Sequence, residues 1–408
     1  VRCIRAAGIM PAAEALQMER DTFQRLRTSR EAFALRHLFF AEREASKYPA
    51  LTGISPRPTA RVAVVGAGTM GSGIAIVSLD AGYETVLIDT TVEGLERGKG
   101  LVHEDYRSRV GRGTLSEAES AARLGRLTTT LDIGALSEAD LVIKAVFEDL
   151  ELKLSVFREI DAVAKPGAVL ATNMSYLDVD AIAATTSRPQ DVLGLHFFSP
   201  AQVMKLLELV RGRLTSDEAM VTGLAFGKRL GKVVVVARNG WGFVGNRIYN
   251  AYRRQCEFML EEGCLPKDVD TAIESFGFAM GPFAVADLTG LDIAWRVRRQ
   301  VAGQRDPRLR YCEIPDMLCE MGRLGRKSGA GYYLYADSAR RGEPDAVVTE
   351  LIRSISARKG MKRRAFTADE IQRRALLAMA NEASLVMEDG IAERASDIDV
   401  VMANGYGF

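Results

Sequence analysis

Short apolar segments alternate with amphipathic segments over much of the first 240 residues. Arg61–Val65 and Thr85–Ile88 are two such apolar segments, and a polar, mostly helical segment runs from Glu93 to about Ser120. Because strand-length segments alternate with helical patterns, we expect a mostly parallel sheet covered by helices on both faces. The further strands expected are Leu141–Val146, Ala168–Ala171, Val192–His196, Leu206–Val210 and Val233–Ala237.

From about Asn239 onward the strand pattern stops and helical periodicity takes over. Helices are expected over Arg247–Glu262, Pro266–Glu274, Ala286–Arg299, 345–359 and 367–389. A faint internal repeat relates this region to itself, since Met259–Gly263 resembles Val386–Gly390, Asp268–Asp270 resembles Asp397–Asp399 and Phe276–Phe278 resembles Tyr406–Phe408. The pattern therefore predicts an all-α domain of two related helical units, with the second unit cut short at Phe408.

Residues 11–47 show the periodicity of an amphipathic helix, with Leu16, Phe23, Leu26 and Phe33 close to one face. The segment from Pro49 to Pro58 holds three prolines and a glycine, which is typical of a linker. We expect the apolar face of the helix to pack on the domain that follows. The predicted division is 1–57 for an N-terminal segment with a linker helix, 58–238 for a Rossmann-type doubly wound sheet, and 239–342 and 343–408 for the helical units.

Charge and composition narrow the classes of function. The chain has 54 Lys and Arg against 53 Asp and Glu, which argues against a nucleic-acid binder. No apolar run approaches the roughly 18 residues of a membrane helix. The five cysteines form no C-x-x-C pair, and the three histidines lie far apart, so no metal site is expected. At 408 residues the chain is long enough for two or three domains.

A glycine fingerprint follows the strand Arg61–Val65 and opens a helix. Its first glycine permits a tight turn, its second lets a pyrophosphate approach the backbone, and its third allows the helix to pack closely on the strand. The start of the helix offers N–H groups to the phosphates. Asp89 ends the next strand, where a carboxylate accepts hydrogen bonds from ribose hydroxyls and repels the 2′-phosphate of NADP. The sequence therefore predicts NAD, bound by Gly66, Gly68, Thr69, Met70, Gly71 and Asp89.

His196 is the one histidine that ends a predicted strand, where the ligand crevice of a parallel sheet lies. A histidine side chain suits general acid–base chemistry near neutral pH. Glu208, on or beside the next strand, could hold the second ring nitrogen, although a surface ion pair with Lys205 explains it equally well. Ser175 and Asn246 could each donate a hydrogen bond to a substrate oxygen, and each also fits a helix cap or a turn.

At these residues the chain resembles the L-3-hydroxyacyl-CoA dehydrogenases, and more closely the dehydrogenase part of hydratase/dehydrogenase fusion enzymes of fatty-acid β-oxidation, of the peroxisomal type and its bacterial relatives. The resemblance covers nearly the whole chain. Besides the glycine fingerprint, the motifs that carry it are Ala145-Val-Phe-Glu-Asp149, Thr172-Asn-Met-Ser175, the segment from His196 to Glu208, Gly242-Phe-Val-Gly-Asn-Arg247 and Met280-Gly-Pro-Phe283.

The resemblance implies NAD-dependent oxidation of (S)-3-hydroxyacyl-CoA to 3-oxoacyl-CoA. It implies that His196 is the general base, Glu208 its carboxylate partner, Ser175 a hydrogen-bond donor to the reacting oxygen, and Asn246 a residue that places the substrate near its thioester. Glu148 and Lys153 match positions near the ribose and nicotinamide of NAD. The N-terminal helix resembles the linker to a hydratase domain, of which residues 1–15 would be the last part.

The chain departs from the family pattern beside Ser175. Met174 stands where threonine is usual, and Tyr176 where a small residue is common, so both are expected to shape the acyl pocket. The expected partners are an acyl-CoA substrate, the missing hydratase domain and, left open, a second copy in a homodimer. The expected place of action is the bacterial cytoplasm, or the peroxisome in a eukaryote.

Three alternatives stay open on the sequence. One is another two-domain NAD dehydrogenase that acts on small hydroxy acids. Another is a non-catalytic NAD-binding protein on the same scaffold, because fold alone does not establish function. The third is a chain that folds but is inactive because its second helical unit is incomplete.

Overall fold

The computed structural model describes residues 1–145, 150–176, 178–336 and 341–407. By internal contacts the chain divides into two compact units. The sheet unit comprises residues 1–240 and 392–405, and the helical unit comprises residues 241–391 and 406–408. No helix in the described ranges is both long enough and apolar enough to cross a bilayer.

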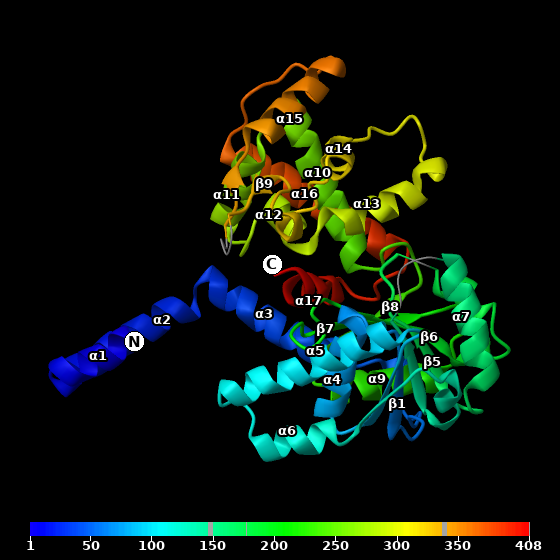
Figure 1. Ribbon diagram of the computed structural model, residues 1–408. Helices are drawn as coiled ribbons and strands as arrows, with labels where there is room; N and C mark the ends of the chain where they lie inside the picture. The colour runs from blue at the N-terminus through cyan, green and yellow to red at the C-terminus, as the bar shows by residue number, and fades with distance from the viewer. Residues whose placement is uncertain (146–149, 177, 337–340, 408) are drawn as a thin grey trace. The chain divides into compact units, whose positions relative to one another are not determined.

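An eight-stranded sheet forms the centre of the sheet unit (Figure 1), in the order β3-β2-β1-β4-β5-β6-β7-β8. Neighbouring strands are parallel except β6 and β7, which are antiparallel. The expectation of a mostly parallel sheet is therefore confirmed. The strands are β1 (Arg61–Val65), β2 (Glu84–Ile88), β3 (Leu127–Thr130), β4 (Leu141–Lys144), β5 (Val169–Thr172), β6 (Val192–Phe197), β7 (Leu206–Arg211) and β8 (Val233–Arg238).

Helices flank this sheet and bury its apolar strands. Helix α4 packs on β1 and β2, α9 packs on β6 to β8, and α8 packs on β6. The core contains fully buried side chains from the strands and from α4, among them Val62, Leu87 and Ile74. The helices between the strands are α4 (Thr69–Asp80), α5 (Val92–Gly111), α6 (Glu117–Leu124), α7 (Leu150–Val163), α8 (Val179–Ala183) and α9 (Asp217–Arg229).

Every strand expected from the apolar pattern is present. The bounds of β1 are those expected, and the other strands differ from their expected bounds by a residue or two; Val146 itself lies outside the described residues. The sequence missed β3. Its residues Leu127-Thr-Thr-Thr130 offer neither an apolar run nor alternation, and β3 pairs only with β2 at the edge of the sheet. An edge strand is bonded on one side only, so it needs fewer apolar residues than a central strand.

The N-terminal segment differs from its prediction. Instead of one helix over 11–47, the chain forms α1 (Arg2–Ile9), α2 (Ala12–Arg27) and α3 (Arg30–Ala45). The break before α3 has a local cause, because the hydroxyl of Ser29 accepts a hydrogen bond from the Ala32 N–H and starts a new helix there.

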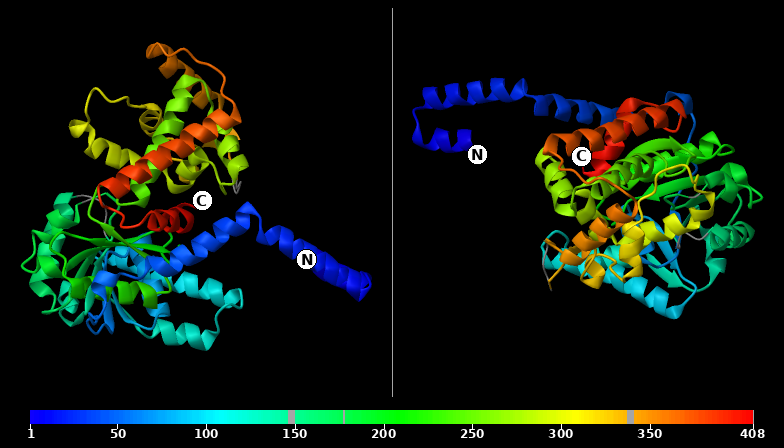
Figure 2. Two further views of the ribbon diagram at one scale, coloured as in Figure 1. Left: turned by 180° about the vertical axis from the view of Figure 1, so that it is seen from behind. Right: turned by 90° about the horizontal axis from the view of Figure 1, so that it is seen from above.

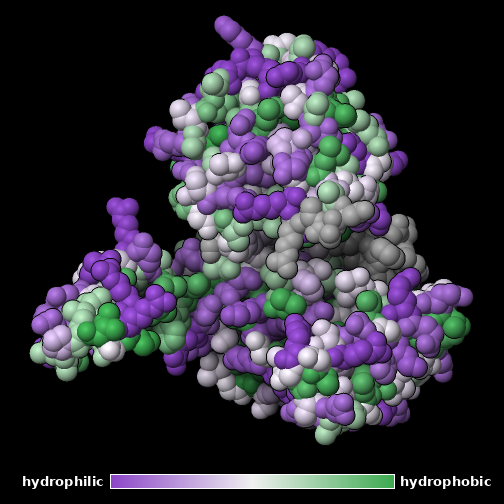
Figure 3. All heavy atoms as spheres, turned by 60° about the vertical axis from the view of Figure 1, so that its left-hand side comes forward, coloured by the Kyte–Doolittle hydropathy of each residue, from purple (hydrophilic) through white to green (hydrophobic). Residues whose placement is uncertain are grey.

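The expectation that the apolar face of this segment packs on the following domain is wrong for most of its length. Leu16, Phe23, Leu26 and Phe33 are each more than half exposed. Figure 3 shows hydrophobic surface on these helices. The end of α3, where Ala41 and Ala45 are buried, does pack against β8.

The helical unit contains the α-helices expected after residue 239 with one exception (Figures 1 and 2). The segment Ala286–Arg299 is not one helix, because Gly290, at φ +95°, separates α12 from α13. Two short strands, β9 (Tyr333–Leu334) and β10 (Glu343–Pro344), also pair here. The helices are α10 (Gly245–Glu262), α11 (Pro266–Phe276), α12 (Pro282–Thr289), α13 (Leu291–Gln300), α14 (Ile314–Glu320), α15 (Ala346–Arg358) and α16 (Ala368–Glu388).

The internal repeat corresponds to two helix pairs, α10 with α11 and α16 with α17 (Ala395–Tyr406). The repeated glycines Gly263 and Gly390, both at positive φ, follow the first helix of each pair. By contacts, however, α17 as far as Gly405 belongs to the sheet unit and lies beside α3 (Figures 1 and 2). There Asn404 donates to Glu42 over 2.9 Å.

Two buried aspartates organise the middle of the helical unit. Asp270 accepts hydrogen bonds from the N–H groups of Phe283 (3.0 Å) and Ala284 (2.9 Å) at the start of α12, and from the Tyr333 hydroxyl (2.8 Å). Asp287 likewise accepts from the Tyr333 N–H over 3.0 Å. Burial raises the pKa of Asp270 to about 7 and that of Asp287 to about 6, against the hydrogen bonds that lower both.

Candidate active site

The glycine fingerprint forms a tight loop between β1 and α4. Gly66 has φ +105°, which favours glycine, and its N–H donates to the Ile88 carbonyl over 2.7 Å. A Cβ on Gly71 would lie 1.8 Å from the Gly66 carbonyl oxygen, so this glycine lets α4 pack against the loop. A Cβ on Gly68 would meet nothing within 4 Å. The loop is therefore closely packed at Gly71 and open at Gly68, which leaves room for a phosphate group.

Asp89 lies directly after β2, beside this loop. Its Oδ2 accepts from the Ala67 N–H over 2.8 Å, and its Oδ1 accepts from the Thr91 N–H over 3.2 Å. A carboxylate has about four acceptor positions, so Asp89 keeps capacity for ribose hydroxyls. No side chain caps the start of α4, whose first N–H groups have no partner within the helix. These features fit a dinucleotide with its pyrophosphate at α4 and its ribose at Asp89.

The sequence interpretation overlooked Gly98 in α5. A Cβ there would lie 2.5 Å from the Ala67 carbonyl oxygen and 2.6 Å from the Ala67 Cβ. The hydroxyl of Ser72 also donates to the Ala67 and Gly98 carbonyls, over 3.2 and 3.3 Å. Gly98 thus lets α5 support the glycine loop. A glycine inside a predicted helix was the signal that could have indicated it.

His196 and Glu208 face each other across the antiparallel strands β6 and β7. They are register partners, so their side chains project from the same face of the sheet. His196 Nδ1 lies 2.6 Å from Glu208 Oε2, and the two residues are 3 % and 0 % exposed. Such burial does not fit the alternative of a surface ion pair with Lys205. Because an ionised carboxylate only accepts hydrogen bonds, this contact places the proton of a neutral ring on Nδ1 and leaves Nε2 as an acceptor.

Ser175 lies on the Nε2 side of the imidazole. Its Oγ lies 3.3 Å from His196 Nε2, and it follows β5 closely, as the sequence pattern predicts. Asn173, which the interpretation of the sequence did not single out, fastens the end of β5 to β6, because its Oδ1 accepts from the Phe197 N–H over 3.0 Å. The ring of Phe198 packs 4.6 Å from the His196 ring, centroid to centroid. The imidazole is therefore held on several sides.

Lys232 holds the connection between β6 and β7, the two strands that carry His196 and Glu208. Its Nζ donates to the carbonyls of Ala201 and Met204, over 2.6 and 2.7 Å. Burial lowers the pKa of Lys232 to about 8. No short-range pattern indicates this contact, since the lysine precedes β8, far along the chain from the loop it binds.

The remaining predicted residues are placed as follows. Asn246 lies at the start of α10 in the helical unit, half-buried, and accepts from the Tyr406 hydroxyl. Thr69 is exposed and Met70 packs against the core of the sheet unit. Glu148 lies outside the described residues, and so does the side chain of Lys153, whose backbone belongs to α7.

The two departures beside Ser175 differ in exposure. Met174 is 1 % exposed and is part of the core, so its side chain does not form surface at the site. Tyr176 is half-buried. Of the two, Tyr176 is the side chain that a bound acyl group could touch.

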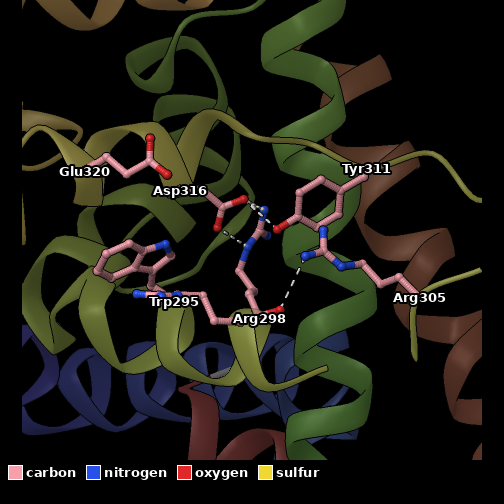
Figure 4. A pocket seen from close by; sticks show the side chains of 7 residues that line it. Trp295, Arg298, Arg305, Tyr311, Asp316 and Glu320 are labelled. Carbon is pink, nitrogen blue, oxygen red and sulfur yellow. Dashed lines mark hydrogen bonds and ion pairs between the residues drawn. The ribbon is translucent and has the colours of Figure 1, made fainter. Parts of the chain in front are cut away.

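A separate hollow of about 460 Å³ lies within the helical unit (Figure 4). Arg298 donates there to Asp316 over 2.9 Å and to Glu257 over 3.2 Å, and the Arg305 guanidinium lies 3.7 Å from the centre of the Tyr311 ring. The buried Arg298 guanidinium thus already binds two carboxylates. We interpret the hollow as part of an ion-pair cluster that joins α13 and α14 to α10. Its lining consists of Trp295, Arg298, Arg299, Arg305, Tyr311, Asp316 and Glu320.

Comparison with known families gives two adjacent matches. Residues 61–240 match the family described as 3-hydroxyacyl-CoA dehydrogenase, NAD binding domain. Residues 242–335 match 3-hydroxyacyl-CoA dehydrogenase, C-terminal domain. The first match contains β1 to β8, and the second contains α10 to α14.

Individual relatives give a consistent result. The chain is 41 % identical, over its whole length, to the peroxisomal bifunctional enzyme of Danio rerio, of which it spans 58 %. Its fold is similar to 3-hydroxybutyryl-CoA dehydrogenase of Escherichia coli, with a TM-score of 0.74, 29 % identity, and coverage of 86 % of this chain and 89 % of that one. It is also similar to (S)-3-hydroxybutyryl-CoA dehydrogenase of Ralstonia eutropha, with a TM-score of 0.62 and 32 % identity over 68 % of this chain and 100 % of that one.

Proposed function

Because the chain belongs to the 3-hydroxyacyl-CoA dehydrogenase family, we propose that it interconverts (S)-3-hydroxyacyl-CoA and 3-oxoacyl-CoA with NAD. The observation that carries the proposal is the buried pair of His196 and Glu208, 2.6 Å apart, with Nε2 directed to Ser175. A non-catalytic NAD-binding protein gives no reason for this pair, and the family matches set the chain apart from dehydrogenases of small hydroxy acids. The proposal covers the dehydrogenase step alone, since the chain spans 58 % of the bifunctional relative.

In this proposal His196 accepts the proton of the 3-hydroxyl group at Nε2. Glu208 holds the ring by Nδ1 in the tautomer whose Nε2 is a hydrogen-bond acceptor, and it stabilises the imidazolium once the proton has arrived. Ser175 donates a hydrogen bond to the same substrate oxygen, on which negative charge develops. In the reverse direction the protonated His196 returns the proton.

The cofactor role is assigned to the loop between β1 and α4. When bound, NAD supplies the acceptor for the hydrogen at C3 of the substrate. Gly66, Gly68, Thr69, Met70 and Gly71 provide the backbone that faces its pyrophosphate, and Asp89 accepts from its ribose. For Glu148 and Lys153 we propose contacts near the ribose and nicotinamide.

The remaining assignments concern the substrate and the setting. For Asn246 we propose a hydrogen bond to the thioester end of the acyl-CoA. The proposed partners are an acyl-CoA, a hydratase domain in the longer parent protein and a second copy in a homodimer, which light scattering would detect. The proposed place of action is the cytoplasm in a bacterium or the peroxisome in a eukaryote.

The test measures NADH consumption with acetoacetyl-CoA for the wild type, His196→Ala and His103→Ala. His103, on α5, is a matched control, because the same substitution is made outside the site. We expect His196→Ala to lose about 10²–10⁴-fold in turnover, as is usual when a general base is removed, and His103→Ala to stay active. Full activity in His196→Ala would contradict the assignment, and turnover of small 2-oxo acids in place of the CoA ester would contradict the substrate class.

A further inference from the structure

Tyr406 contacts Asn246, the residue proposed above to bind the thioester end of the substrate. Its hydroxyl donates to Asn246 Oδ1 over 2.8 Å, and both residues belong to the helical unit. Its ring stacks on that of Tyr249, with centroids 5.2 Å apart and planes at 28°. Tyr249 lies one helical turn after Asn246 on α10. Tyr406 is therefore held by α10 at two points.

The hydrogen bond decides which end of the Asn246 amide is left for a ligand. An amide presents an oxygen that accepts and an NH₂ group that donates, and a rotation of half a turn exchanges them. Because Oδ1 is taken by the Tyr406 hydroxyl, Nδ2 is directed away from it. Nδ2 has no hydrogen-bond partner in the part of the chain that the structure describes, so its donors are available. Donors suit the carbonyl oxygen of a thioester, which only accepts.

The internal repeat shows that this hydroxyl is particular to one copy. Tyr406-Gly-Phe408 in the second copy corresponds to Phe276-Gly-Phe278 in the first. Phe276 has no hydroxyl group, and the residue is 54 % exposed. The corresponding position can thus end a helix of this unit without a tyrosine, so the fold alone does not require the hydroxyl.

We propose that Tyr406 is a positioning residue for the acyl-CoA, which holds the Asn246 amide with its donors toward the substrate. This inference rests on the proposed function. It predicts that Tyr406→Phe, which keeps the stacked ring, raises KM for acetoacetyl-CoA by about 3- to 10-fold, the effect of one neutral hydrogen bond. KM for NADH and the unfolding midpoint stay near those of the wild type.

The decisive experiment is a double-mutant cycle between Tyr406→Phe and Asn246→Ala. If Tyr406 acts through Asn246, Tyr406→Phe has no further effect on KM in the Asn246→Ala background. Tyr311→Phe is the matched control, because it removes another tyrosine hydroxyl bond of the helical unit, to Asp316, and is expected to leave KM unchanged. An unchanged KM in Tyr406→Phe, or an equal increase in both backgrounds, would overturn the inference.

Direct binding of acetoacetyl-CoA, measured by calorimetry, separates this inference from the proposed function. A wild type that binds the ester without turning it over would overturn the proposed function, while weaker binding by Tyr406→Phe would still support the positioning role. A wild type that neither binds nor converts the ester would overturn both.

Discussion

At the scale of single residues, the chemistry depends on side chains that different strands bring together. The position of His196 could be predicted, because an apolar run ending in histidine places that side chain at a strand end. Its pairing with Glu208 depends on β6 and β7 being antiparallel. A buried strand shows the same apolar run in either direction, so local pattern alone could not specify this partner.

Other residues of the site could not be predicted because they bind backbone atoms of distant segments. Asn173 accepts from the Phe197 N–H, and Lys232 donates to the carbonyls of Ala201 and Met204. Neither contact requires a particular partner side chain. A sequence shows such residues as ordinary polar positions, and only the fold shows what they hold.

Asp89 carries a prediction about cofactor choice. Asp89→Asn can keep the hydrogen bond from the Ala67 N–H but removes the charge that repels a 2′-phosphate. We expect the preference for NADH over NADPH, as a ratio of kcat/KM values with acetoacetyl-CoA, to fall about tenfold, which corresponds to about 1.4 kcal/mol. An unchanged ratio would show that Asp89 does not face the adenosine ribose.

At the scale of elements, apolar periodicity predicted the strands and most helices, and it failed where a single residue interrupts or replaces the pattern. The three threonines of β3 give no apolar pattern, so this edge strand was not predicted. Ser29 starts a new helix inside an amphipathic segment, and Gly290 separates two helices that read as one. In each case the hydrogen bonding or the φ angle of a few residues, and not the average hydrophobicity of the segment, determines the secondary structure.

Two glycines of α5 give a matched test of how this helix supports the cofactor loop. Gly98→Ala would place a Cβ 2.5 Å from the Ala67 carbonyl oxygen, whereas a Cβ on Gly100 meets nothing within 4 Å. We expect Gly98→Ala to weaken NADH binding and to lower the free energy of unfolding by about 1–3 kcal/mol. Gly100→Ala should raise that free energy by about 0.5–1 kcal/mol and leave NADH binding unchanged.

Fluorescence titration with NADH and urea unfolding of the two variants provide the measurement. Equal NADH affinity in Gly98→Ala and Gly100→Ala would mean that α5 does not support the loop between β1 and α4.

At the scale of the whole molecule, the chain combines a sheet unit and a helical unit. The internal repeat in the sequence predicted two related helix pairs. What it did not indicate is that residues 392–405, which include most of α17, have their contacts in the sheet unit. There Arg394, directly before α17, donates to the Glu44 and Lys47 carbonyls. Such contacts join segments about 350 residues apart in sequence. Periodicity within either segment gives no information about them.

The helical unit should lose stability as pH rises toward neutrality, because of Asp270. Its pKa is 3.8 ordinarily and about 7 in the folded chain, so between these values only the folded chain binds the proton. The contribution of this group is therefore fully present below about pH 4 and is lost as pH rises through about 7. Its slope is at most about 1.4 kcal/mol per pH unit.

Asp270→Asn removes this titration and serves as the comparison. The free energy of unfolding of the wild type minus that of the variant should fall between about pH 5 and about pH 7 and level off above about pH 8. Trp241 and Trp295 are the two tryptophans of the chain and both lie in the helical unit, so their fluorescence reports its unfolding. Parallel pH curves for the two proteins would contradict a raised pKa of Asp270 in the folded chain.

The central claim is that His196 and Glu208 act as one catalytic pair. Its most direct test measures kcat/KM for NAD-dependent oxidation of (S)-3-hydroxybutyryl-CoA in His196→Ala, Glu208→Gln and the double variant. Residues that act as a unit are strongly non-additive. We predict a loss of about 10²–10⁴-fold for His196→Ala and a double variant no worse than that single variant. Losses that multiply in the double variant, or wild-type values in either single variant, would contradict the claim.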